Sequence, residues 1–127
     1  MKDISAEYRR QGPKICAIGG GHGLSNMLRG LKNYTENLSA IVTVADDGGG
    51  SGMLRQDLGM PPPGDIRNCL EALANTEPLM SELMRYRFKD GSLAGQSFGN
   101  LFIAALNGIS PSFDAAVRRM HLTRLWK

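Results

Sequence analysis

The chain has 127 residues, enough for one domain, and its 42% hydrophobic and 21% charged residues are the composition of a globular protein, not a disordered one. Its net charge of +3 is concentrated at the two ends and mixed between them, which argues against a nucleic-acid-binding surface. Cys16 and Cys69 form no CxxC pair, so we expect neither a zinc site nor a disulfide, and we predict two buried thiols of a reduced protein.

The first thirteen residues are polar and end in Gly12-Pro13, which predicts a flexible leader. They lack the apolar segment of a signal peptide, and the chain nowhere has the roughly eighteen consecutive apolar residues that suggest a membrane span. We therefore expect a cytoplasmic protein that does not cross a membrane.

Residues 14–45 have the pattern strand, glycine turn, helix, strand. A short apolar run at 14–18 enters a glycine cluster, after which apolar residues recur with helical spacing up to Leu31. The run at 40–45 is apolar almost throughout, as expected for a strand covered on both faces. Two strands joined by a helix make a right-handed parallel unit. The predicted fold class is therefore α/β, with a Rossmann-like parallel sheet flanked by helices.

The middle of the chain predicts a second glycine cluster followed by helices. This cluster spans 48–52, and a triproline at 61–63 separates it from a helix for which Asp65 is the expected N-cap. Pro78 suits the first position of a further helix.

The last part of the chain predicts a turn at 91–95 and two helices, capped by Ser97 and by Ser110. The whole sequence therefore predicts two strands and five or six helices. We predict that residues 14–120 form the N-terminal part of a nucleotide-binding α/β domain, which is incomplete, and that 121–127 are an atypical tail.

The first glycine cluster is a candidate phosphate-binding or sugar-binding loop. Glycines between a strand and a helix let the backbone approach a ligand, and the helix start offers free N–H groups to an anion. The spacing does not fit the dinucleotide fingerprint, which needs a glycine or alanine where Leu24 stands, and no GK[ST] follows as in a Walker loop. A plain turn is the alternative. The candidate residues are Gly19, Gly20, Gly21 and Gly23.

Asp46 and Asp47 follow the second predicted strand, at the edge where open α/β sheets place their ligands. They could accept hydrogen bonds from ribose hydroxyls, bind a divalent metal such as Mg²⁺, or cap the next turn. Gly48, Gly49 and Ser51 add a second set of backbone and hydroxyl groups for the ligand.

Two later segments carry polar residues at predicted helix starts. Arg67 and Asn68 lie in the first turn after Asp65, where the helix dipole disfavours a cation. A ligand should therefore compensate Arg67, or else an acid does so, either Asp65 or one elsewhere. Gln96, Ser97 and Asn100 suit neutral hydrogen bonding to a sugar or base, and the alternative is an N-cap with two exposed amides.

Four segments, taken in this order, resemble the gluconeogenesis-factor branch of the CofD-like family: 17–25, 43–52, 62–70 and 95–102. The resemblance covers about residues 14–120, well under half of a full family member. The chain departs from the family pattern at His22, where threonine is usual, at Gly50, where serine is usual, and at Gln96, where histidine is usual.

The resemblance implies a regulatory protein of the bacterial cytoplasm that binds UDP-sugars such as UDP-N-acetylglucosamine and supports cell shape and wall synthesis on gluconeogenic carbon sources. It also implies that Asp46 and Asp47 are the acidic pair of the shared motif and that the first glycine cluster is the phosphate-side loop. The alternative is a Mg²⁺-dependent phosphotransferase of the 2-phospho-L-lactate transferase type. We expect a binding protein more than an enzyme, with a nucleotide ligand, and leave open whether it forms homo-oligomers.

Overall fold

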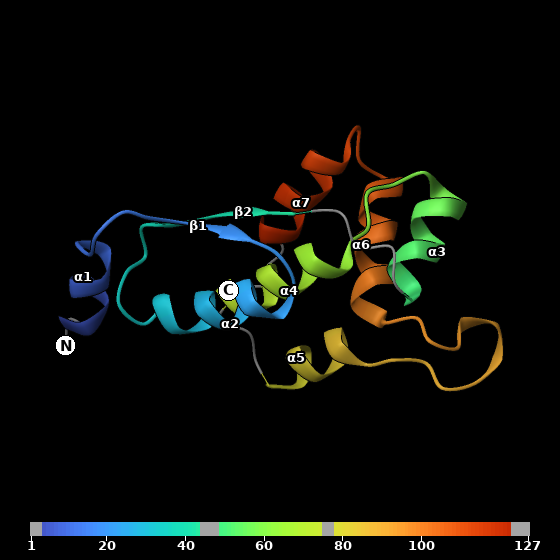
Figure 1. Ribbon diagram of the computed structural model, residues 1–127, viewed down its shortest axis with the longest axis horizontal. Helices are drawn as coiled ribbons and strands as arrows, with labels where there is room; N and C mark the ends of the chain where they lie inside the picture. The colour runs from blue at the N-terminus through green and yellow to red at the C-terminus, as the bar shows by residue number, and fades with distance from the viewer. Residues whose placement is uncertain (1–3, 44–48, 75–77, 123–127) are drawn as a thin grey trace.

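The computed structural model describes residues 4–43, 49–74 and 78–122, which form an elongated molecule with α1 at one end and α3 toward the other (Figure 1). In chain order they are α1 (Ile4–Arg10), β1 (Ile15–Gly19), α2 (Gly21–Leu31), β2 (Leu38–Val42), α3 (Gly49–Leu58), α4 (Gly64–Leu73), α5 (Pro78–Arg85), the short 3-10 helix η1 (Gly91–Leu93), α6 (Phe98–Gly108) and α7 (Phe113–Leu122).

The predicted parallel βαβ unit is confirmed. Strands β1 and β2 pair in parallel, from Ile15 opposite Leu38 to Gly19 opposite Val42, and α2 connects them. The second strand begins slightly earlier than the apolar run at 40–45 suggests, and the end of that run lies outside the described residues. The fold is α/β, with a parallel sheet packed against helices.

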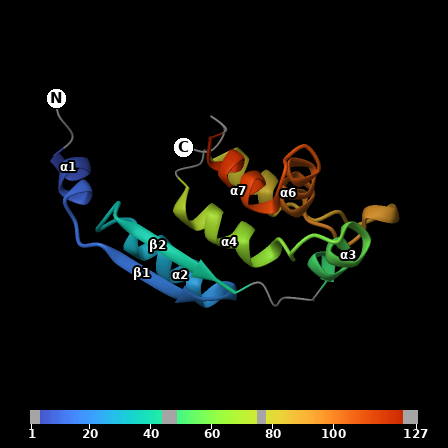
Figure 2. The same cartoon turned by 90° about the horizontal axis from the view of Figure 1, so that it is seen from above.

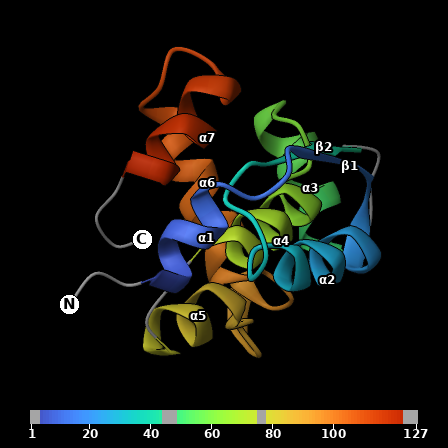
Figure 3. The same cartoon turned by 90° about the vertical axis from the view of Figure 1, so that its left-hand side faces the viewer.

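Both helices that pack on the sheet, α2 and α4, lie on the same side of it (Figure 3). Leu24, Leu28 and Cys69 pack there against the inward-facing Ala17 of β1. The opposite face is open in the described part of the chain, where Ile18 is 71% exposed and Ile41 is 56% exposed. The expectation of strands covered on both faces is therefore wrong for these residues.

The two cysteines differ in exposure, and strand alternation explains the exposure of Cys16. Cys16 lies next to Ala17 and therefore points to the uncovered face, where it is exposed, whereas Cys69 of α4 is buried. The prediction of two buried thiols holds only for Cys69.

A second core joins the helices at the end of the molecule away from α1 (Figure 2). Its buried members are Leu54, Met60, Ala74, Met84, Ile103 and Met120. The apolar α6 has 11 residues, and a membrane span needs about 20. In the ranges that the structure describes, no helix is long and apolar enough to cross a membrane.

The leader contains helix α1, where the sequence predicts no regular structure. The Arg9 carbonyl accepts a hydrogen bond from Glu36 N at 2.9 Å. The Asn37 side chain donates to the carbonyls of Arg10 and Gly12, at 2.9 and 2.8 Å. These bonds tie the leader to the loop before β2, and such long-range contacts leave no periodic signal in a short polar segment.

Two helices start differently from the prediction. Helix α3 begins at Gly49, inside the second glycine cluster that we expected to be a loop. Helix α4 has Pro63 as its N-cap, so Asp65 is the second helical residue and does not cap the helix. An acid in the first turn still interacts favourably with the helix dipole.

The two last helices are both capped by serine. Ser97 is the N-cap of α6, as predicted, and its side chain accepts a hydrogen bond from Asn100 N at 3.0 Å. The residue that performs this role for α7 is Ser112, whose hydroxyl accepts from Ala115 N at 3.1 Å, so the prediction of Ser110 is wrong by two positions.

Candidate functional site

The candidate site is built around the turn from β1 into α2. The Gly19 carbonyl accepts a hydrogen bond from Thr43 N at 2.8 Å, which holds the ends of the two strands together. Gly20 is the extended N-cap of α2, and Gly21 has a φ of 61°, in the left-handed region that favours glycine. The turn therefore starts α2 at the end of the sheet to which both strands point (Figure 2).

The backbone of this turn is open on one side and closely packed on the other. A Cβ at Gly20 would overlap the Thr43 hydroxyl and would lie 3.7 Å from Asp65 Oδ2. A Cβ at Gly21 or Gly23 would meet no described atom within 4 Å. Because the N-cap is glycine, it has no side chain to cap the helix, and it makes no side-chain hydrogen bond to the first N–H groups of α2.

Asp65 places an acceptor beside these donors. It lies in the first turn of α4, a half-buried position, and its carboxylate adjoins Gly20. Burial and, to a smaller extent, the charge of Asp65 raise the pKa of the Cys69 thiol, which lies one turn further along α4. The start of α2 and the start of α4 thus form one polar corner with N–H donors and a carboxylate acceptor.

Arg67 is buried, and the structure identifies the acid that compensates it. Its Nη1 donates to Glu71 Oε1 at 2.8 Å, and its Nε donates to Asn100 Oδ1 at 2.9 Å. Burial lowers the pKa of Arg67, and the nearby Glu71 carboxylate opposes this effect. The sequence left open whether a ligand, Asp65 or another acid compensates Arg67. In the structure the compensating acid is Glu71.

Glu71 and Gly99 complete this buried network. The other carboxylate oxygen of Glu71 accepts from Arg85 Nε at 3.0 Å, which adds α5 to the network. A Cβ at Gly99 would lie 2.5 Å from Arg67 Cδ and 2.6 Å from the Met84 carbonyl oxygen, so only glycine lets α6 approach the arginine this closely. Sequence reasoning missed both residues, because the burial of the Arg67–Glu71 pair and the close approach of Gly99 to Arg67 both depend on how the helices pack.

Gln96 connects the start of α6 to α3. It is buried, and its amide nitrogen lies 3.0 Å from the sulfur of Met53. Its Oε1 is buried without a hydrogen-bond partner among the residues that the structure describes. An unpaired buried acceptor costs about 1–3 kcal/mol, so a donor at this position would stabilise the protein.

The predicted site residues fall into two described groups. Gly19, Gly20, Gly21 and Gly23 gather with Asp65, and Arg67 gathers with Ser97 and Asn100; the first turn of α4 belongs to both groups. Asn68 is half-buried on α4.

The acidic pair is not placed by the structure. The predicted ligand and metal residues Asp46 and Asp47, together with Gly48, lie outside the described residues. Gly49 and Ser51 belong to the first turn of α3.

Comparisons with known proteins agree on one family. The family described as 2-phospho-L-lactate transferase CofD matches residues 15–125. A protein of Thermoanaerobacterium thermosulfurigenes is 72% identical over 109 residues, which are 86% of this chain and 34% of that protein. The gluconeogenesis factor of Bacillus subtilis is 55% identical over 111 residues, 87% of this chain and 35% of that protein.

A crystal structure of a protein from Bacillus halodurans superposes on the chain with a TM-score of 0.83 and 48% identity. The match covers 87% of this chain and 36% of that chain. The chain thus spans about a third of the length of these similar proteins.

Proposed function

This chain belongs to the 2-phospho-L-lactate transferase CofD family, and on that premise we propose that it binds a nucleotide sugar, with UDP-N-acetylglucosamine as the representative ligand. The diphosphate lies on the N-terminus of α2, and hydroxyl groups of the ribose or sugar donate to Asp65. The protein acts as a regulator through this binding. The similarity to gluconeogenesis factors supports the regulatory role.

The observation that carries the proposal is the corner between α2 and α4. The start of α2 offers N–H groups and open space above Gly21 and Gly23, which suits a phosphate. Asp65 adjoins Gly20 and would repel a bare phosphate, but it is a strong acceptor for hydroxyls. A ligand that carries both a diphosphate and several hydroxyls satisfies donors and acceptor together, and a nucleotide sugar is such a ligand.

The energetics require more than this one helix. An anion at a helix N-terminus gains about 0.3–2 kcal/mol, whereas micromolar affinity needs about 8 kcal/mol. We therefore include the second glycine cluster in the site, with Gly48, Gly49 and Ser51 on the diphosphate and Asp46 and Asp47 on the ribose or on Mg²⁺. In this proposal Asn68, Ser97 and Asn100 lie on the side of the sugar or base, and Arg67 helps to position Asn100.

A phosphotransferase is the second candidate, and the family description favours it. In that reaction Asp46 and Asp47 would bind Mg²⁺, which stabilises charge on a transferring phosphoryl group. The role in cell shape and wall synthesis and the cytoplasmic location that the resemblance implies belong to the first candidate. They stay predictions.

Calorimetric titration of UDP-N-acetylglucosamine into the protein, with and without Mg²⁺, tests the proposal. We expect saturable binding, weaker binding of UDP, and no binding of N-acetylglucosamine alone, because the diphosphate supplies the contacts to α2. The full-length Bacillus subtilis gluconeogenesis factor is the matched reference for affinity. Absence of binding in both proteins contradicts the proposal, and Mg²⁺-dependent turnover of the ligand with an alcohol acceptor would favour the transferase.

A further inference from the structure

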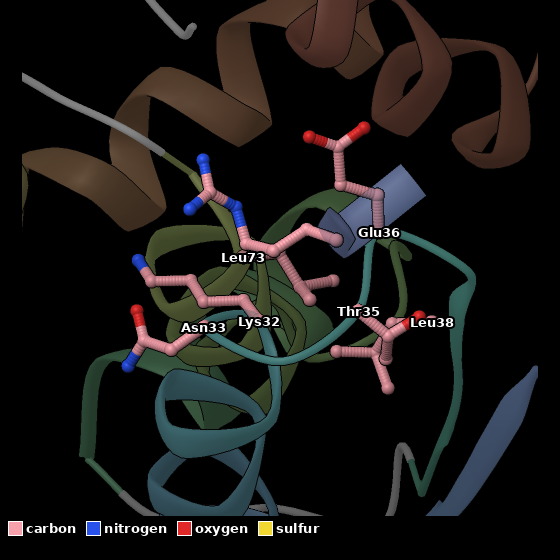
Figure 4. A pocket seen from close by; sticks show the side chains of 7 residues that line it. Lys32, Asn33, Thr35, Glu36, Leu38 and Leu73 are labelled. Carbon is pink, nitrogen blue, oxygen red and sulfur yellow. The ribbon is translucent and has the colours of Figure 1, made fainter. Parts of the chain in front are cut away.

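Among the residues that the structure describes, the one buried side-chain nitrogen or oxygen atom without a hydrogen-bond partner is Oε1 of Gln96. Gln96 is 3% exposed, and buried polar atoms almost always have a partner. The polar side chains that line the cavity of about 420 Å³ beyond the end of α2 already have partners within the chain (Figure 4). Lys32, for example, donates to the Ala74 carbonyl at 2.9 Å. The unmet hydrogen-bonding capacity therefore lies at Gln96 and not at this cavity.

Hydrogen bonds of the backbone hold Gln96 in place. The Gln96 N–H donates to the Leu93 carbonyl at 2.9 Å, and the Gln96 carbonyl accepts from Phe88 N at 2.9 Å. On either side, Gly95 N donates to the Phe88 carbonyl at 2.9 Å, and Ser97 caps α6. The segment is therefore ordered before any ligand arrives, so a ligand that pairs with the amide loses little affinity to ordering it.

Met53 of α3 contacts the Gln96 amide. Its sulfur lies 3.0 Å from Gln96 Nε2, and a thioether sulfur is only a weak acceptor. Met53 is 46% exposed, and its side chain is unbranched and flexible, so it can turn toward water. Both polar groups of the amide are then available to a ligand, because Nε2 can exchange a weak acceptor for a stronger one and Oε1 can gain a donor.

The amide lies close to the start of α3, which belongs to the proposed nucleotide-sugar site. Met53 follows Gly49, the first residue of α3, by four positions, which at about 1.5 Å per residue is roughly 6 Å along the helix. Ser97 is next to Gln96 in the chain and has been assigned to the side of the sugar or base. A ligand whose diphosphate lies against Gly49 can therefore extend its nucleoside toward Gln96.

We propose that Gln96 recognises the base of the nucleotide sugar and that this base is uracil; the inference rests on the proposed function. Gln96 Oε1 accepts a hydrogen bond from uracil N3–H, and Gln96 Nε2 donates to a neighbouring uracil carbonyl oxygen after Met53 has turned away. A primary amide has one acceptor beside one donor group, and the ring imide of uracil has the complementary pair. A sugar hydroxyl would satisfy Oε1 alone and leave Nε2 on the sulfur, so the base fits the amide better.

Methylation of uracil N3 tests this contact without changing the protein. In calorimetry the wild type should bind N3-methylated UDP-N-acetylglucosamine about tenfold more weakly than UDP-N-acetylglucosamine, a loss of roughly 1.4 kcal/mol that corresponds to one hydrogen bond. Equal affinity for the two ligands overturns the role of Gln96 and leaves the proposed function standing. Absence of binding of both ligands overturns this inference together with the proposed function.

Gln96→Met separates recognition from a structural role, because methionine keeps the unbranched shape and removes both polar groups of the amide. Loss of an unpaired acceptor should leave the midpoint of urea unfolding unchanged or raise it, whereas the affinity for UDP-N-acetylglucosamine should fall about tenfold. Methylation of N3 should cause no further loss in this variant.

Gln56→Met is the matched control, because Gln56 is an exposed glutamine on the same helix as Met53. This variant should bind both ligands as the wild type does. Wild-type affinity for UDP-N-acetylglucosamine in Gln96→Met overturns the proposal. The comparison of the two ligands on the wild type decides the question should Gln96→Met fail to fold.

Discussion

Replacing Glu71 by glutamine should destabilise the protein far more than breaking an exposed ion pair of the same geometry. The Glu71 carboxylate is 3% exposed and accepts hydrogen bonds from Arg67 at 2.8 Å and Arg85 at 3.0 Å. Glutamine has nearly the same shape, so the packing is kept, but it cannot compensate the charge of the buried Arg67.

The expected magnitude follows from burial. Removal of one partner from a buried ion pair costs about 3–5 kcal/mol, because the other charge is left uncompensated. Arg85 is 56% exposed and can turn to water, so most of the cost arises at Arg67, which is 8% exposed. We therefore expect a loss of about 3 kcal/mol, a large part of the 5–15 kcal/mol that stabilises a typical domain.

Arg118→Gln is the matched control, because Arg118 and Asp114 form an i,i+4 pair at 3.0 Å whose side chains are 78% and 76% exposed. An exposed pair contributes about 0–1 kcal/mol. Urea unfolding of both variants at low micromolar concentration measures the two losses. Equal midpoints and slopes for Glu71→Gln and Arg118→Gln would refute the argument that burial makes the network important.

Four further outcomes are expected. Asp65→Ala should weaken binding of UDP-N-acetylglucosamine about tenfold in calorimetry. The affinity for inorganic diphosphate should stay the same, because that ligand has no sugar hydroxyls that donate to Asp65. Equal losses of affinity for both ligands would argue against Asp65 as the acceptor for hydroxyls. Gly21→Ala and Gly59→Ala both introduce a side chain at a φ of 61° in open space. Both substitutions should therefore lower the free energy of unfolding in urea by about 1–2 kcal/mol. Only Gly21→Ala should lower the affinity for UDP-N-acetylglucosamine. Iodoacetamide should alkylate the exposed Cys16 and spare the buried Cys69, as mass spectrometry can show. Burial raises the pKa of the Cys69 thiol in the folded state. The contribution of this thiol to stability is therefore present below its unfolded pKa and is lost as pH rises through its folded pKa. Between pH 8 and pH 10 the wild type should lose more stability than Cys69→Ala does.

The order of elements could be predicted where the sequence is periodic or marked by a cap. The strand, glycine turn and helix at β1 and α2 carry such a signal, and so do Pro78 at the start of α5 and Ser97 before α6. Helix α1 could not be predicted, since it depends on hydrogen bonds from Glu36 and Asn37, far along the chain. The one-sided covering of the sheet was also missed, because an apolar strand does not reveal what covers it.

The candidate site could be predicted in part. Glycines at a strand-to-helix turn are recognisable in sequence, and Gly20, Gly21 and Gly23 occupy that turn. The contact between Gly20 and Asp65 joins segments that only the fold brings together. The partner of Arg67 is one helical turn away, at Glu71, and it is the burial of both side chains that makes this pair structural; burial cannot be read from spacing alone.

The proposed function depends on the N-terminus of α2 holding the phosphate of the ligand, and a pair of alanine substitutions in that helix tests this placement. Gly23 and Gly30 lie about two turns apart on the same face of α2, and a Cβ at either would meet no described atom within 4 Å. Both changes should therefore be tolerated and stabilise the helix by up to about 1 kcal/mol. The Cβ at Gly23 leans toward the helix start, beside the first N–H groups of α2.

The measurement is the affinity for UDP-N-acetylglucosamine, determined by calorimetry for both variants. We expect Gly23→Ala to bind at least tenfold more weakly than the wild type while Gly30→Ala binds equally well, with neither variant less stable in urea. Wild-type affinity in Gly23→Ala would contradict the claim and place the ligand away from the start of α2.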